Sequence, residues 1–151
     1  MRPTVEEQLL GTCRILEKVV SPCVADPYAR TMLDGLIANL RMLTSALPAV
    51  PGFLDSDNRA TARLLGQLQV VVSTDLAAAI QTTLGRPEPD ATDMTALDRR
   101  NRELRELLSQ ALCGGDLTPA LRGAALEHMS TRAARAPMRY VSTASTPAKT
   151  T

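Results

Sequence analysis

Aromatic residues are almost missing from this sequence of 151 residues, which holds one Phe, two Tyr and no Trp. A β-sandwich usually builds its core from aromatic and β-branched side chains, whereas helices pack well with Leu, Ile, Val, Met and Ala. Hydrophobic residues still make up 44% of the chain and charged residues 22%, which is ordinary for a folded domain. The composition therefore predicts an all-α fold with an aliphatic core.

Residues that bind metals or carry out reactions are also scarce. The cysteines Cys13, Cys23 and Cys113 form no CxxC pair, and the single histidine, His128, cannot complete a zinc or di-iron set. No carboxylate falls on an apolar stripe, and no phosphate loop, nucleophile elbow or dinucleotide motif is found. We predict no metal, no cofactor and no catalytic residue, with Cys13 and Cys113 packed in the core.

Long apolar runs and a strong net charge are absent as well. No segment approaches the roughly 18 apolar residues of a membrane span, and the charged start MRPTVEEQ is not typical of a signal peptide. The formal net charge of +1 gives little attraction toward nucleic acid or an anionic membrane. We therefore expect a cytoplasmic protein without a membrane or nucleic-acid partner.

Capping and proline signals divide the first half of the chain into two helices. The first begins after Thr4, whose spacing from Glu7 is that of a capping box, and ends at Pro22. The second begins with Asp26 and Pro27, and we expect a turn over residues 48–53 to end it. Its apolar residues follow a seven-residue repeat that predicts a packed seam, formed by Ala29, Leu33, Leu36, Leu40, Leu43 and Leu47.

The second half of the chain predicts three more helices. One runs from about residue 55 to Gly85, and we favour a single bent helix there, although Ser73 could instead cap a new one. The next spans residues 92–114 and carries four-apart opposite charges on its outer side. A short fifth helix begins at Thr118 and ends near residue 136. We predict one domain over residues 1–136, an up-down four-helix bundle with a short fifth helix, followed by a mostly disordered tail over residues 137–151.

Several helical segments together resemble a known group of proteins. They are VVSPCV at residues 19–24, IANLRML at 37–43, LDRRNRELRELLSQAL at 97–112 and a basic last helix that runs into PMRY at 137–140. On these segments the chain resembles an uncharacterised family of small bacterial helical proteins encoded near aminoglycoside-phosphotransferase-like kinases and acyl-CoA dehydrogenases. The family closes with Pro-Arg-Tyr, whereas this chain inserts Met138. The resemblance, over most of residues 4–141, implies a shared fold and an accessory role, and no catalytic residue.

Two asparagines lie on or beside the predicted apolar stripes. Asn101 falls between Leu97 and Leu104, and Asn39 borders the seam of the second helix. A buried Asn left without partners costs about 1–3 kcal/mol, so we expect the two side chains to hydrogen-bond to each other. Such a pair would fix the register of the helices, or it would anchor a ligand between them.

Basic residues suggest two further hypotheses. Arg99, Arg100, Arg102 and Arg105 could face an anionic ligand such as a coenzyme A thioester, although Asp98, Glu103 and Glu106 can neutralise them on the same helix. Arg122 and His128 superficially match the Arg-spacer-His pattern of helical ribonucleases, but six residues of helix place their side chains about 120° apart.

We therefore expect a non-enzymatic accessory or interaction protein that self-associates as a homodimer or binds a protein partner. A bundle that binds a small acyl or CoA-type molecule is the first alternative, because Ala77, Ala78 and Ala79 leave room beside a helix. A helical ribonuclease-like domain is the second alternative.

Overall fold

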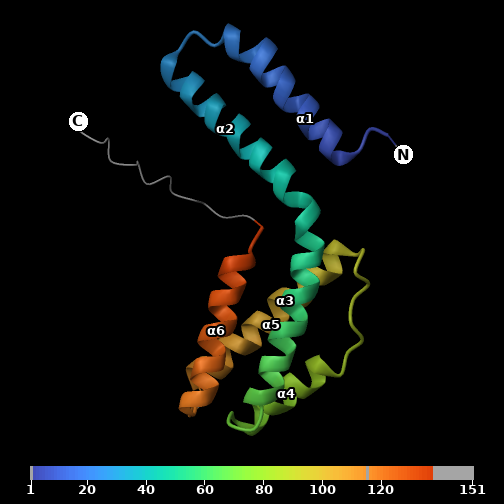
Figure 1. Cartoon of the computed structure of the whole chain (residues 1–151), viewed down its shortest axis with the longest axis vertical. Helices are drawn as coiled ribbons and strands as arrows, with labels where there is room; N and C mark the ends of the chain where they lie inside the picture. Colours follow the sequence, from blue (N-terminus) through green and yellow to red (C-terminus); the bar gives the residue numbers. More distant parts are fainter. Residues whose placement is uncertain (1, 115, 138–151) are drawn as a thin grey trace, which may run out of the picture.

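The computed structural model describes residues 2–114 and 116–137, and these residues form helices joined by short connections (Figure 1). The all-α prediction is confirmed, and no strand occurs in that part of the chain. The predicted disordered tail lies outside the described residues from position 138 onward. The six α-helices are α1 (Val5–Ile15), α2 (Pro27–Ala46), α3 (Val50–Leu68), α4 (Thr74–Leu84), α5 (Met94–Gly114) and α6 (Pro119–Arg135).

Three of the expected helix starts are confirmed in atomic detail. The side chain of Thr4 accepts a hydrogen bond from the backbone N–H of Glu7, and Glu7 bonds back to complete the capping box of α1. The side chains of Asp26 and Thr118 accept hydrogen bonds from the N–H of Ala29 and of Leu121 to cap α2 and α6, and each is followed by a proline in the first turn. These residues satisfy backbone donors that have no partner within the helix.

The expected turn at residues 48–53 is wrong. A 3₁₀ turn, η3 (Leu47–Ala49), joins α2 to α3, so that the chain continues from one helix into the next as a bent rod (Figure 1). Pro48 lies in the first turn of η3 and Pro51 in the first turn of α3. A proline is tolerated there because the N–H that it lacks would have no helical partner. The prolines therefore bend the rod without ending it.

The single long helix expected up to Gly85 is also wrong, and the alternative with a second cap is observed. α3 ends at Leu68, and the hydroxyl of Ser73 accepts a hydrogen bond from the N–H of Leu76 at 3.4 Å to begin α4. The break turns α4 back, so that Ile80 packs in the same core as Leu65 and Leu68. Burial of the Ile80 side chain in this core favours the break between α3 and α4 over one continuous helix.

The helices do not form the expected up-down bundle from the first four segments. α3, α4, α5 and α6 surround one core, whereas α1 and α2 pack on each other and project from it as a helical hairpin (Figure 1). The hairpin turn contains a π-helical segment, η1 (Leu16–Val20), and a 3₁₀ turn, η2 (Ser21–Cys23), at the expected Pro22. We call residues 5–46 the hairpin and residues 50–135 the α3–α6 unit. Within the described residues, no helix combines the length and hydropathy needed to cross a membrane.

Candidate functional site

A buried polar cluster joins three helices of the α3–α6 unit. The carboxylate of Asp57 in α3 accepts hydrogen bonds from Asn101 in α5 at 2.7 Å and from Arg132 in α6 at 2.9 Å. The amide of Asn101 also donates to Asn58 at 2.9 Å, and Asn58 donates to the carbonyl of Leu97 at 3.0 Å. We call Asp57, Asn58, Asn101 and Arg132 the Asp57 cluster.

The Asp57 cluster is better suited to fixing the register of the helices than to catalysing a reaction. Among the described residues, no buried side-chain nitrogen or oxygen lacks a hydrogen-bond partner. The cavity beside Asp57 and Arg132 has a volume of about 20 Å³, room for about one water molecule. A buried hydrogen-bonded ion pair orients the elements that carry it, even where its desolvation penalty exceeds the Coulombic attraction. The cluster therefore sets how α3, α5 and α6 meet.

Asn101 is buried, but its expected hydrogen bond to Asn39 is not formed. Asn39 lies exposed on α2, which packs against α1 and does not reach α5. Asn101 instead pairs with Asp57, which does fall on the buried face of α3, contrary to the expectation that no carboxylate lies on an apolar stripe. The spacing of Asp57 from Leu54 and Leu64, three and seven residues, is the signal that sequence reasoning missed.

The four arginines of α5 do not share one surface. Arg100 is buried and donates to the carbonyl of Thr83 at the end of α4. Arg99, Arg102 and Arg105 are exposed, and Arg102 forms the expected ion pair with Asp98 at 2.9 Å. Glu103, the expected partner of Arg99, instead pairs with Arg86 at 3.1 Å. The structure thus uses Arg100 to hold α4 against α5, and Arg99 and Arg100 also line a surface pocket of about 320 Å³, whereas Arg102 and Arg105 lie outside it.

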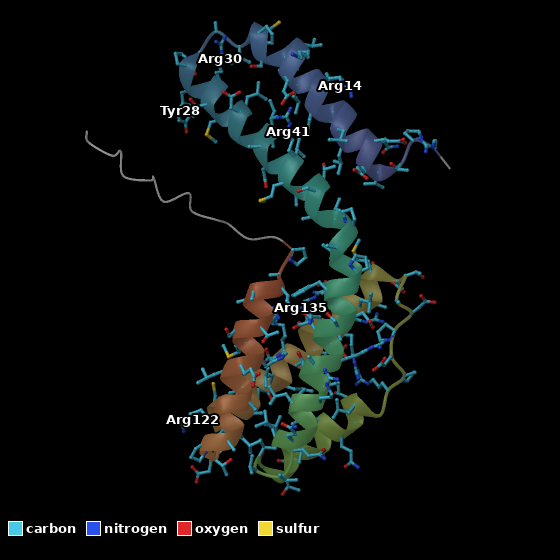
Figure 2. The ribbon with its side chains drawn as sticks, viewed as in Figure 1. Arg14, Tyr28, Arg30, Arg41, Arg122 and Arg135 are labelled. Carbon is cyan, nitrogen blue, oxygen red and sulfur yellow. The ribbon has the colours of Figure 1, made fainter. Side chains whose placement is uncertain are left out.

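Arg122 and His128 are not brought into one site. Arg122 is exposed near the start of α6 (Figure 2), whereas the Nε2 atom of the half-buried His128 lies 3.1 Å from the hydroxyl of Thr61 in α3. The histidine therefore serves as a helix-to-helix contact. The cysteines are all free, and Cys113 is exposed, so the expectation that it packs in the core is wrong, while Cys13 is buried. Over residues 2–114 and 116–137, no group of His, Cys, Asp or Glu side chains is arranged to hold a metal.

A shallow groove of about 410 Å³ lies between α5 and α6. Leu108, Leu112 and Met129 supply apolar walls, and Arg105 and His128 supply polar atoms. The expected pocket beside the alanines of α4 does not include the asparagines, because Asn39 lies in the hairpin and the amide of Asn101 is taken by Asp57. The α5–α6 groove is a candidate small-molecule site that does not depend on the asparagines.

The hairpin leaves half of its large apolar side chains exposed. Cys13, Ile37, Thr44 and Ala46 are its only buried residues. The expected seam of α2 is rotated, because Ile37 is buried where Leu36 was expected and Leu36 is 49% exposed. A single neighbour, α1, covers only a narrow stripe of α2. The large hydrophobic residues that stay exposed in the hairpin are Val5, Leu10, Ile15, Val19, Val20, Tyr28, Met32 and Leu36.

Most of these apolar residues gather on one side of the hairpin, whereas Leu10 lies on the other side beside Arg14 and Arg41. At about 100° per residue of an α-helix, Ile15 of α1 and Met32 and Leu36 of α2 fall on the same side of the plane through both helix axes, and Val19 lies about one turn beyond Ile15 in η1. Val5 and Leu43 fall on that side too, and Tyr28 lies at its outer edge. The polar residues there are Gln8, Thr12 and Asn39, none of which carries a charge. We call this set of residues the uncharged face.

The charged side chains of the hairpin lie on its other side. By the same geometry, every charged residue of Val5–Val20 and Pro27–Ala46 falls away from the uncharged face. Arg41 forms an ion pair with Glu17 across the two helices there, and Figure 2 shows Arg41 between them while Arg14 and Tyr28 lie at opposite edges. The hairpin is therefore amphipathic as a whole, with one side suited to water and one side suited to a partner.

Comparison with family models, with curated proteins and with solved structures finds no match to this chain. The features that bear on function are therefore the geometric ones: a polar cluster with its hydrogen bonds satisfied, a shallow groove, and an exposed apolar face on a projecting hairpin.

Proposed function

We propose that the chain is a non-enzymatic interaction protein of the cytoplasm, in which the hairpin binds a protein partner and the α3–α6 unit is a stable body that carries it. The observation behind this proposal is the exposure of the uncharged face, where Met32 is 59% and Val19 62% exposed. Removing apolar surface from water contributes about 25 cal/mol per Å², so a protein that covers this face gains substantial free energy. Large exposed apolar patches mark such interaction sites.

The polar groups of the α3–α6 unit support the same proposal. A general acid or base needs a reachable proton donor or acceptor, whereas Asp57 and Asn101 are engaged with each other and buried. The sequence resemblance to helical proteins encoded near acyl-CoA dehydrogenases and kinases adds an enzyme of either kind as a partner to test.

Site-specific photo-crosslinking in the cells that encode the protein tests the proposal. A photoreactive residue in place of Met32 should form protein adducts, because it lies in the uncharged face. The same group in place of Asp34, exposed on the charged side of the same helix, should form few. Adducts would be identified by mass spectrometry. Equal yields at both positions, or no protein adducts at position 32, would contradict an interaction role for the uncharged face.

The α5–α6 groove favours a second candidate function, which is binding of an acyl or CoA-type ligand. Its leucines and Met129 suit an acyl chain, and the exposed Arg105 suits an acidic head group. A thermal-shift titration with long-chain acyl-CoA should raise the melting temperature, and Met129→Trp should abolish that rise by filling the groove. Unchanged melting of the wild-type protein at saturating ligand would remove this candidate.

A further inference from the structure

We infer that the partner of the uncharged face is a second copy of the same hairpin, so that two chains pack face to face and their four helices form an intermolecular four-helix bundle. This inference rests on the proposed interaction function and specifies its partner. The two-helix arrangement, the charge distribution and the size of the face each support it.

The hairpin lacks the partners that helices need to enclose a core. Leu9, Leu16, Leu33 and Leu40 line the contact between its two helices but stay only half-buried. In the α3–α6 unit, by contrast, Leu65, Leu68 and Leu104 have no exposed surface at all. A helix is apolar along one stripe and must cover it against other helices, and four is the common number that closes such a core. A second hairpin supplies the two helices that are missing.

The charge distribution suits contact between identical faces. A two-fold symmetric interface brings the same patch of both subunits together, so a charge in that patch would often meet a like charge. Repulsion of this kind costs several kcal/mol, and the uncharged face avoids it. Residues 5–46 also hold four basic and five acidic side chains, so the hairpin as a whole has a formal net charge of only −1 to oppose association.

The size of the face is sufficient for a stable dimer. α2 has 20 residues. At 1.5 Å per residue such a helix is about 30 Å long, and two adjacent helices are about 20 Å wide. The flat outline is therefore roughly 600 Å² for each chain, and side-chain relief increases the accessible area further. Stable complexes bury about 600–1,000 Å² per partner, so this face lies at the lower end of that range.

Asn39 gives the interface a register. It follows Met32 and Leu36 and precedes Leu43 at the four-three-four spacing of a helical seam, and it is exposed in the single chain. An asparagine at one seam position selects the alignment in which its amide finds a polar partner. Asn39, Gln8 or Thr12 of the second copy would provide that partner. The register role first expected between Asn39 and Asn101 is thus assigned to a contact between chains.

Sedimentation velocity of the full-length protein over a range of concentrations tests the inference. The wild-type chain should behave as a dimer at micromolar concentration. Met32→Glu with Leu36→Glu should raise the dissociation constant at least 100-fold, because both charges would be buried against their own copies. The matched control, Thr31→Glu with Ala38→Glu, adds the same two charges at exposed positions on the other side of α2 and should change it less than threefold. Far-ultraviolet circular dichroism would verify that both variants keep their helices.

The possible outcomes separate this inference from the proposed function. The second-copy inference would be overturned if the wild-type chain were still a monomer at about 100 micromolar. It would also be overturned if both double variants raised the dissociation constant equally. If the photoreactive residue at position 32 then still formed adducts with a different protein in cells, the interaction function would stand without self-association. If the purified chain were monomeric and position 32 formed no protein adducts, both would fail.

Discussion

The hairpin and the α3–α6 unit are both built from amphipathic helices, yet they reach opposite degrees of burial. In the α3–α6 unit the apolar stripes meet, so that Leu104 and Ile80 are completely buried. In the hairpin the stripe of each helix has one neighbour, and Tyr28 remains 74% exposed. The contrast teaches that an apolar stripe indicates a need for a partner and does not say whether the partner belongs to the same chain.

The largest effect is expected from deleting a core side chain of the α3–α6 unit. Leu104→Ala should lower the free energy of unfolding by about 4 kcal/mol, because a cavity would remain among tightly packed neighbours. Ile37→Ala in the hairpin should lower it by about 2 kcal/mol, since the open hairpin can collapse around the loss. Urea denaturation followed by circular dichroism measures both. Equal losses would show that the two regions are packed to the same extent.

The Asp57 cluster should give the next largest effect. Asp57→Leu leaves the Arg132 guanidinium without its acceptor in a partly buried position and should lower the free energy of unfolding by about 3 kcal/mol. The double variant Asp57→Leu with Arg132→Met should recover at least half of that loss, because no uncompensated charge remains. Additive losses in the double variant would argue against coupling between the two side chains.

Helix caps should give the smallest effects and again separate the two regions. Ser73→Ala removes the cap of α4 in the α3–α6 unit and should reduce stability by about 1 kcal/mol. Thr4→Ala removes the cap of α1, which packs on α2 outside the α3–α6 core and can open locally, and should change global stability by less than about 0.5 kcal/mol. Thermal unfolding of both variants tests this order, and a larger loss for Thr4→Ala would reverse it.

Local signals in the sequence predicted the helices well, because capping is decided within a few residues. Thr4, Asp26 and Thr118 all begin helices as expected. The breaks were harder to predict, since Pro48 and Pro51 fit the first turn of a new helix and Ser73 can either interrupt a helix or begin one. Those outcomes depend on which distant side chains are buried.

The candidate sites were less predictable, because they depend on which helices meet. The sequence indicated that Asn101 is buried, but its partners Asp57 and Arg132 lie on α3 and α6, far from it along the chain. The uncharged face could not be predicted from the sequence for the same reason. The predicted seam of α2 included Leu36 but not Met32, and only the arrangement in space shows that both side chains stay largely exposed in the described chain.

Hydrogen exchange of the full-length protein at two concentrations, one far below and one far above the dimer dissociation constant, tests the central claim most directly. If a second copy covers the uncharged face, the amides of α1 and α2 should exchange much more slowly at the higher concentration, because local opening of the hairpin would then require dissociation. The amides of α3 and α5 should exchange at the same rate in both samples. Equal exchange of the hairpin amides at the two concentrations would contradict the account.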